Sequence, residues 1–422
     1  MLDTPRLTTT PSRQHRLGCT LATQCCEESC RSSVNVLMST VTNGPAHRPG
    51  RVVAQNAAQK VHEYFTRHWQ QIRDTSQDTL VSIASADAIE AVIDAAFRTS
   101  LRREEGYIPR LSLAILAPEE AVQPLVFEEA LWLTPERLAR VSPAVARPGL
   151  HVAVWSVGDE LHAWGTVRSI PLSCCVIEVV APGLLVIKHG ASEQSRKFVN
   201  VAVLENDQIK IVDDRASAIA GCPPLVSSVL GCDSAPRLDS VDVLQELAVS
   251  MREHRRGGTL LVVRGDSDLW RESIVHPINY AVRPRFSMLA ELAHGPGTRS
   301  GRDWESDLSG AVEMIGGLTA VDGATVITDH YELIAFGAKI APRDGHSRVE
   351  HVTVTEPIED TVSVIVHPTR LGGTRHSSAV QFVNDQRDAI ALVASQDGHF
   401  TVFSWSPSDT MVHAHRIEAL LL

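Results

Sequence analysis

The sequence predicts an α+β or α/β protein in which a C-terminal mixed β-sheet flanked by helices follows a smaller α+β domain. Helical spacing of apolar residues, short β-rich runs between turn signals, and one internal stretch rich in Pro, Ser, Gly and Cys support this organisation. At roughly 100 to 200 residues per domain, 422 residues suffice for two or three domains. We expect a disordered segment over 1–50, an α+β domain over 51–215, a linker over 216–238 and a second domain over 239–422.

The N-terminal 50 residues are rich in Ser, Thr, Arg and Cys and have no hydrophobic periodicity, which is typical of disorder. Met38 offers a second start after Met1, and we expect the residues before it to reflect an upstream start codon. The Cys spacings of the chain include no Cys-x-x-Cys pair, which argues against a zinc ribbon or a thioredoxin motif.

The first domain is expected to begin with two helices. Apolar residues recur at three- and four-residue intervals from Ala54 to Ile72, and Ser85 can cap a second helix for which Gly106 supplies a stop. The period then changes to that of strands. The predicted strands are Arg110–Leu116, Val152–Ser156, Leu161–Val167, Val176–Ala181, Leu184–Lys188, Phe198–Leu204 and Gln208–Val212.

In the second domain, Ser240 can cap a helix that ends at Gly257-Gly258, and Ser306 can cap a later one. A further helix is expected near Ala379–Gln386. The remaining predicted elements are the helix Met288–Ala293 and the strands Thr259–Val263, Ala324–Thr328, Glu332–Gly337, Val362–Val366, Ile390–Ala394 and Phe400–Trp405. His413 and His415 alternate along a final strand, which favours a surface or edge position over a metal site.

Composition excludes several classes of function. Hydrophobic residues make up 44% and charged residues 21%, and no run reaches the roughly 18 uncharged apolar residues of a membrane span. The formal net charge of −11 would repel a polyanion, which argues against duplex nucleic acid as a partner. Without a secretory leader pattern, we expect a cytoplasmic protein with free thiols. Local amides and a few Arg residues can still capture a small anion such as a nucleotide.

A candidate phosphate site lies at Gly372-Gly373-Thr374-Arg375-His376-Ser377-Ser378, after a predicted strand and before a helix. Glycine lets the backbone approach a ligand, a helix start offers unpaired amides, and the polar side chains add donors. The segment lacks the Gly-Lys-Ser/Thr of a Walker loop. An alternative interpretation stays open: Ser377 or Ser378 caps the helix, and Arg375 is a solvated surface cation.

A candidate acid lies at Asp322-Gly323-Ala324, where a predicted strand begins. An Asp at this position can hold a divalent metal or assist deprotonation of a hydroxyl, and Gly323 would let a sugar lie against the backbone. The alternative is an ordinary Asp-Gly turn that enters a strand.

Together the two segments resemble the diadenylate cyclase domain, whose signatures are Asp-Gly-Ala opening a strand and Gly-Thr-Arg-His-Arg opening a helix. Here they occur in the same order as Asp322-Gly323-Ala324 and Gly373-Thr374-Arg375-His376. The resemblance covers roughly residues 238–405, including Gly257-Gly258-Thr259 and Ser395-Gln396-Asp397-Gly398. Residues 50–215 resemble, more weakly, the sensor region attached to some bacterial cyclases.

The resemblance implies a regulated diadenylate cyclase, which condenses two ATP into cyclic di-AMP and releases two pyrophosphates with the help of Mg²⁺ or Mn²⁺. It implies a homo-oligomer in which catalytic domains meet face to face, and an unidentified small-molecule effector at the sensor. The implied catalytic residues are Asp322, Gly323, Arg375 and His376. The implied ATP-binding residues are Ala324, Gly373, Thr374, Ser377, Ser378 and Ser395, and the implied metal-binding acids are Asp322 and Asp397.

One position departs from the family pattern, because Ser377 stands where the second Arg of Arg-His-Arg is expected. A lost charge-assisted hydrogen bond is worth about 1.5 to 3 kcal/mol, roughly 10- to 150-fold in binding or rate. Arg370 or Lys339 could supply the missing charge. The alternative function is a catalytically impaired module that binds ATP or cyclic di-AMP and signals without turnover.

Overall fold

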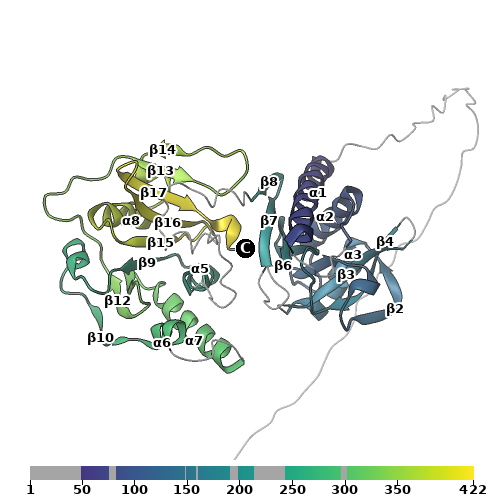
Figure 1. Cartoon of the computed structure of the whole chain (residues 1–422), viewed down its shortest axis with the longest axis horizontal. Helices are drawn as coiled ribbons and strands as arrows, with labels where there is room; N and C mark the ends of the chain where they lie inside the picture. Colours follow the sequence, from purple (N-terminus) through teal and green to yellow (C-terminus); the bar gives the residue numbers. More distant parts are fainter. Residues whose placement is uncertain are drawn as a thin grey trace, which may run out of the picture. The chain divides into compact units, whose positions relative to one another are not determined.

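The computed structural model describes residues 49–75, 82–147, 149–157, 160–190, 198–212, 243–295 and 302–422. Over these residues the fold is α+β, with two mixed β-sheets and seven α-helices (Figure 1). This agrees with the predicted class. The predicted linker over 216–238 and all but the last two residues of the predicted disordered segment over 1–50 lie outside the described residues. The bounds of the four predicted segments stay predictions.

The first sheet has eight strands in the order β2-β4-β3-β1-β5-β6-β7-β8. Its one parallel pair joins β1 to β3, and its other pairs are antiparallel. The strands are β1 Leu111–Ile115, β2 Leu125–Trp132, β3 His151–Val157, β4 Glu160–Val167, β5 Cys175–Ala181, β6 Leu184–Gly190, β7 Phe198–Glu205 and β8 Gln208–Ile211.

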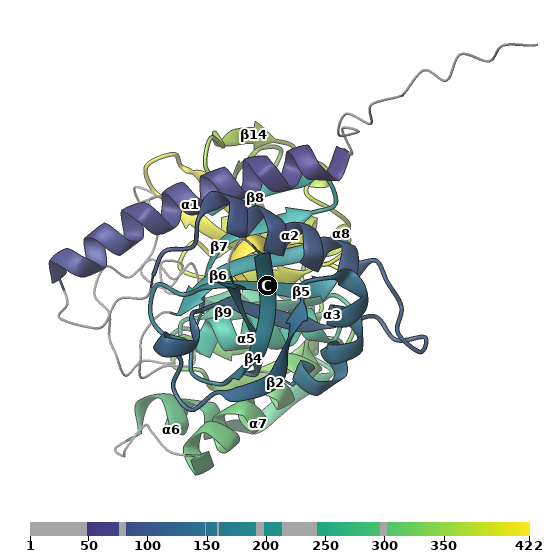
Figure 2. The ribbon, with the colours of Figure 1, turned by 90° about the vertical axis from the view of Figure 1, so that its right-hand side faces the viewer.

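Helices α1 (Pro49–Thr75), α2 (Ala86–Ser100) and α3 (Pro135–Val141) accompany this sheet, and α1 and α2 run across it in Figure 2. The main core packs apolar residues of these helices against alternate strand residues such as Leu113 and Ile177. The expected cap of α2 is confirmed, because the Ser85 hydroxyl accepts a hydrogen bond from the Ala88 amide.

Three expectations for this part were incomplete or wrong. Helix α2 ends at Ser100, so Gly106 is not its stop. Helix α3 begins after Thr134, whose hydroxyl accepts from the Arg137 amide, and it was not expected. Strand β2 was missed because it is an edge strand with mostly exposed side chains, so it shows little apolar alternation.

The second sheet has nine strands in the order β10-β12-β11-β9-β15-β16-β17-β13-β14. Strand β9 is parallel to β11 and antiparallel to β15, and β13 is parallel to β17. The strands are β9 Gly258–Val263, β10 Tyr280–Phe286, β11 Ala324–Thr328, β12 Leu333–Ala338, β13 Val352–Thr355, β14 Val364–Val366, β15 Ile390–Ala394, β16 Phe400–Ser406 and β17 Met411–Arg416.

Helices cover both faces of this sheet. Strand β9 sends Leu260 and Val262 into a core shared with α5 (Val243–Glu253), α6 (Met288–His294) and α7 (Arg302–Leu318). Its alternate residues Leu261 and Val263 enter a second core shared with α8 (Thr374–Asp385). This explains why the predicted strand at 259–263 is a continuous apolar run rather than an alternating one.

Four expectations for this part are corrected. Ser306 lies inside α7, which begins at Arg302, and α8 begins at Thr374, five residues before its predicted start. Strands β10 and β13 were not predicted. His413 and His415 lie on β17, an interior strand between β16 and β13, and both are buried rather than at a surface or edge.

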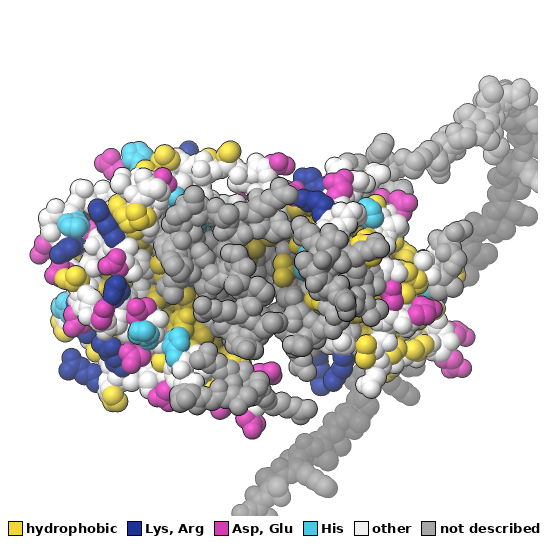
Figure 3. Space-filling view, in the orientation of Figure 1, with side chains coloured by type: hydrophobic (Ala, Val, Ile, Leu, Met, Phe, Trp, Pro, Cys, Tyr) yellow, Lys and Arg dark blue, Asp and Glu magenta, His cyan; other side chains and the backbone are white. Residues whose placement is uncertain are grey.

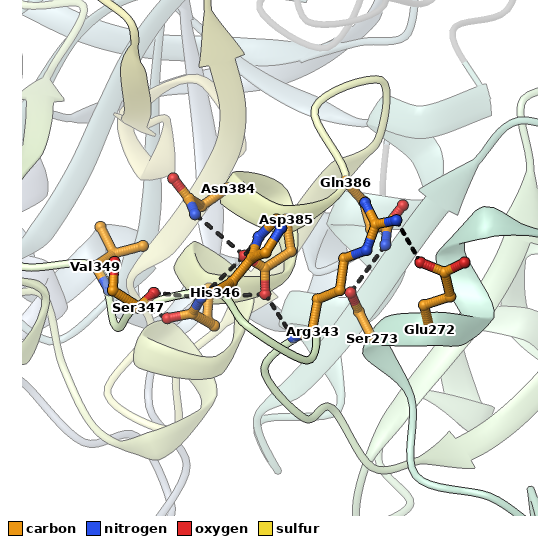
Figure 4. Close-up of polar contacts among 10 residues, drawn as sticks. Glu272, Ser273, Arg343, His346, Ser347, Val349, Asn384, Asp385 and Gln386 are labelled. Carbon is orange, nitrogen blue, oxygen red and sulfur yellow. Dashed lines mark hydrogen bonds and ion pairs between the residues drawn. The ribbon is translucent and has the colours of Figure 1, made fainter.

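A buried carboxylate joins α8 to the segment that leads into β13. The side chain of Asp385 is fully buried and accepts hydrogen bonds from the Arg343 amide (3.0 Å), His346 Nδ1 (2.9 Å), Gln381 Nε2 and Asn384 Nδ2 (Figure 4). Burial alone would raise the pKa of Asp385, but these hydrogen bonds together lower it below its ordinary value.

Asp385→Ala is expected to lower the free energy of unfolding by about 2 to 3 kcal/mol, because it leaves several buried donors unsatisfied. Asp385→Asn keeps the shape and one acceptor and should cost about half as much. Urea denaturation followed by circular dichroism measures both values. Equal stability of Asp385→Ala and the wild-type protein would contradict the structural role of this carboxylate.

Four buried histidines predict an acid-sensitive fold. Burial lowers the pKa of His151, His189, His376 and His415 from the ordinary 6.5 to about 4. The unfolded chain therefore binds more protons than the folded chain between these values. Each histidine contributes up to about 3 kcal/mol to the free energy of unfolding. This contribution is complete above pH 6.5 and is lost as the pH falls to about 4.

His415→Gln should flatten the fall of the unfolding free energy between pH 6.5 and 4, even though it lowers stability at pH 7. The unfolding free energy of the variant should depend less steeply on pH than that of the wild-type protein, because the variant lacks one titrating group. In the wild-type protein the ring of this group contacts Thr355 and Ser404. Urea denaturation at four pH values measures it. An unchanged slope would show that His415 is already protonated in the folded protein.

Surface features agree with the composition. On the face shown in Figure 3, acidic and basic side chains are interspersed with apolar ones. Within the described ranges, no helix has both the length and the apolarity that a membrane crossing requires.

Candidate functional site

Three neighbouring strands of the second sheet bring distant parts of the chain to one edge. Thr325 of β11 pairs with Leu260 of parallel β9, so Asp322 and Gly257 precede the two strands at the same edge. Ala394, the last residue of antiparallel β15, pairs with Gly258, so Ser395 also lies there. We call this the Gly257 edge, formed by the residues just outside the three strands: Gly257, Asp322 and Ser395. Adjacent strands lie about 4.8 Å apart, so Asp322 and Ser395 lie on either side of Gly257.

The Asp322-Gly323 segment joins this edge to strand β12. Gly323 has φ +107°, and a Cβ atom there would lie 2.5 Å from the carbonyl carbon of Gly337. Only glycine permits both this backbone conformation and this close approach. The Asp322 side chain is 90% exposed, and its Oδ2 lies 3.7 Å from Lys339 Nζ. The carboxylate is therefore open to a ligand and already has one cation beside it.

Arg375 reaches the same edge from the first turn of α8. A Cβ atom on Gly257 would lie 2.9 Å from Arg375 Nη1 and 3.3 Å from the Ala394 carbonyl oxygen, so the guanidinium lies over Gly257. Gly373 is the N-cap of α8 and makes no side-chain capping bond. The first amides of a helix have no partner within the helix, so this end of α8 offers donors to an anion.

The structure overturns the alternative in which Ser377 or Ser378 caps the helix, because α8 begins at Thr374 and both serines lie inside it. Thr374 is exposed, whereas Ser377 and Ser378 are half-buried. Arg370 ends a short 3₁₀ helix (Pro368–Arg370) just before the glycines and is exposed. Ala324, the first residue of β11, is buried.

His376 differs from the other predicted site residues because it is 4% exposed. Its ring packs edge-on against Phe403, and Nε2 has no hydrogen-bond partner among the described residues. Burial, followed by the charges of Arg416, His399 and Arg375, lowers its pKa to about 4. The imidazole is therefore neutral at pH 7 and supplies no positive charge to a phosphate.

Asp397 lies in the turn between β15 and β16. Its amide donates to the Ser395 hydroxyl at 3.3 Å, and its side chain is exposed. The next residue back, Gln396, donates to the Arg256 carbonyl oxygen. These contacts attach the β15–β16 turn to the turn before β9, so Ser395 and Asp397 border the Gly257 edge.

A divalent cation fits this edge only as the partner of a bound polyphosphate. Within the described residues, no group of three His, Cys, Asp or Glu side chains is arranged to hold a metal ion. Mg²⁺ often takes one or two carboxylates and completes its shell with water and substrate phosphates. Asp322, exposed and oxygen-bearing, suits that role, and Asp397 lies beyond Ser395, on the far side of β9 from β11.

Sequence reasoning missed further cations at this edge. Arg255 and Arg256 are exposed in the turn before Gly257, and Arg416 ends β17 opposite Thr401. The sequence does carry a signal for Arg255 and Arg256, because both directly precede the paired glycines Gly257-Gly258. The edge thus carries positive charge on a chain whose net charge is −11, as an anion site on an acidic protein requires.

Comparison with known proteins places one similarity in the first part of the chain. Residues 78–168 match the family model described as "Probable sensor domain DACNV", a range that includes α2 and β1 to β4. No curated protein matches the chain.

The chain is also similar to a solved structure from Bacillus cereus, described as a hypothetical membrane spanning protein. The sequence identity is 14% and the TM-score 0.23, and the alignment covers 40% of this chain and 60% of that chain. A TM-score this low does not establish a shared fold.

Proposed function

We propose that the chain is a diadenylate cyclase regulated by an N-terminal sensor domain. The observation that carries the proposal is the Gly257 edge: an exposed carboxylate (Asp322) precedes β11, and the Arg375 guanidinium, from the open start of α8, lies over the start of adjacent β9. The matched sensor model over residues 78–168 supports the same proposal, because it indicates a sensor associated with diadenylate cyclases.

In this proposal, each catalytic domain binds one ATP and two domains meet face to face. The 3′-hydroxyl of each ribose attacks the α-phosphate of the other ATP, a P–O bond forms, and the bond to the departing pyrophosphate breaks. Asp322 accepts the hydroxyl proton or holds the metal. Arg375, Thr374 and the first amides of α8 bind the phosphates, and Mg²⁺ or Mn²⁺ supplies charge neutralisation. Gly323 and Ser395 line the nucleotide-binding site.

A second candidate function is a module that binds ATP or cyclic di-AMP and signals without turnover. Two observations favour it: Ser377 replaces a cation that the resembled family places next to His376, and His376 is buried and uncharged. In both functions an unidentified small molecule would act at the sensor domain.

Incubation of the purified full chain with ATP and Mn²⁺ or Mg²⁺ separates the two functions. Mass spectrometry should detect cyclic di-AMP together with two pyrophosphates per product molecule. Tight ATP binding by calorimetry without product would support the signalling module. Absence of both product and nucleotide binding would reject the two functions together.

Ser377→Arg is expected to raise nucleotide affinity or turnover by roughly 10- to 150-fold, the value of one charge-assisted hydrogen bond. Residue 377 lies in the first turn of α8, at the position where the resembled family has its second Arg. Isothermal titration with ATP and the cyclase assay measure the two effects. Ser306→Arg, at an exposed residue near the start of α7, is the matched control. An unchanged variant would show that Lys339 or another cation already supplies this charge.

A further inference from the structure

His254 uses both nitrogens of its ring to connect two turns at the Gly257 edge. It directly follows α5, and its Nε2 lies 3.0 Å from the Thr319 hydroxyl oxygen at the end of α7. The Arg256 amide donates to His254 Nδ1 at 3.1 Å. The side chain is half-buried.

The hydrogen bonds require one protonation state of this ring. The Thr319 hydroxyl donates its only proton to the Gly316 carbonyl oxygen at 2.6 Å, so it accepts from His254 Nε2. Nδ1 must be an acceptor, because a backbone amide points at it. His254 is therefore the neutral tautomer with its proton on Nε2.

The two partners of His254 each precede a part of the proposed site. Thr319 lies three residues before Asp322, and Arg256 directly precedes Gly257, over which the Arg375 guanidinium lies. The contact is close: a Cβ atom on Gly258 would lie 2.7 Å from the Thr319 hydroxyl oxygen. Glycine at 258 therefore allows the α7–β11 turn to approach the start of β9.

We propose that His254 is a positioning residue that fixes the separation between the starts of β9 and β11, and hence between Arg375 and Asp322. This role rests on the proposed function. His254 touches neither nucleotide nor metal in that function; it acts through Thr319 and the Arg256 amide. A displacement of about 1 Å between reacting groups can reduce a rate about 100-fold, so loss of this link should slow the reaction more than it weakens binding.

Protonation of His254 would break the link at Nδ1, because a second N–H would then face the Arg256 amide. Burial lowers the pKa of His254, and the positive charges of Arg256 on the same turn and Arg375 on α8 lower it further. The neutral ring is therefore kept at pH 7. We expect turnover to fall below pH 6.5 with a component that disappears in the His254 variants.

Variants of the link separate positioning from general stability. His254→Gln keeps a side-chain N–H that reaches Thr319, whereas His254→Asn keeps the acceptor near Nδ1 but falls short of Thr319. Thr319→Val removes the hydroxyl and Thr319→Ser retains it. His351→Gln is the control, because His351 is exposed and directly precedes β13.

With the full chain, ATP and Mn²⁺, we expect His254→Asn and Thr319→Val to lower kcat by 10- to 100-fold with KM changed less than about threefold. His254→Gln, Thr319→Ser and His351→Gln should stay within about threefold of the wild-type kcat. Equal losses in His254→Gln and His254→Asn, or kcat values that follow the melting temperature alone, would overturn the proposal.

A readout independent of turnover keeps this inference distinct from the proposed function. ¹⁵N NMR of the histidine side chains, with His254→Gln for assignment, should show His254 neutral with its proton on Nε2 at pH 7. If the wild-type protein makes no cyclic di-AMP but shows this tautomer, the cyclase proposal fails and the link stands, with its effect then measured on the Kd for Mn²⁺–ATP. A proton on Nδ1 at pH 7 would overturn the link itself.

Discussion

Asp322→Asn is expected to reduce production of cyclic di-AMP by about 1,000-fold, because the amide can neither accept the proton of the attacking hydroxyl nor hold a metal as a carboxylate does. The substitution preserves size, and the wild-type side chain is 90% exposed, so stability should not change. The affinity for ATP without metal should be retained or rise, because Lys339 then faces the phosphates without a competing carboxylate. The cyclase assay and calorimetry measure the two quantities.

Asp344→Asn provides the matched control for this substitution. Asp344 is also exposed and also precedes a glycine with positive φ, Gly345 at +79°, but it lies in the segment between β12 and β13 rather than at the Gly257 edge. The Asp344→Asn substitution should leave the formation of cyclic di-AMP unchanged. Equal activity of Asp322→Asn and the wild-type enzyme would remove Asp322 from the reaction.

Gly323→Ala should lower the free energy of unfolding by about 4 kcal/mol. A methyl group at this residue meets the Gly337 backbone at 2.5 Å, and the φ of +107° is unfavourable for any residue with a Cβ atom. The two backbones cannot separate without displacing β11 from β12, which pair directly beyond this point at Ala324 and Ala338. Urea denaturation measures the loss, and the variant should also lose nucleotide binding.

Gly310→Ala is the control for Gly323→Ala, because Gly310 lies in α7 with no atom within 4 Å of an added Cβ. It should raise stability by about 0.5 to 1 kcal/mol, since alanine has less conformational freedom to lose in a helix. A Gly323→Ala variant as stable as the wild-type protein would show that the β11–β12 junction is less tightly packed than the structure indicates.

The elements that the sequence predicted well carry their signals locally. Ser85 supplies a side-chain cap, and the strands around Leu261 and Leu392 are continuous apolar runs buried on both faces. Edge strands β2 and β10 were missed because exposed residues dominate them, and only pairing with a neighbour defines them. The start of α8 was misplaced because its N-cap is Gly373, which has no side-chain signal.

The candidate site shows the same division between local and tertiary information. The motif residues Asp322 and Arg375 could be named from the sequence, and so could the glycines that let the backbone approach. The burial of His376 against Phe403 depends on packing between α8 and β16. The residues next to His376 in the sequence do not predict this packing. The contact of His254 with Thr319 joins residues that are far apart in the chain and carries no motif at all.

The order in which the Gly257 edge is assembled has a consequence for synthesis on the ribosome. Strands β9 and β11 emerge early in the second part of the chain, but α8 with Arg375 and then β15 with Ser395 follow only near its end. Until β15 pairs with β9, Ser395 and Arg375 are not held beside Gly257. In the proposed function, a nascent chain therefore gains the capacity to hold a nucleotide only after α8 and β15 have been translated.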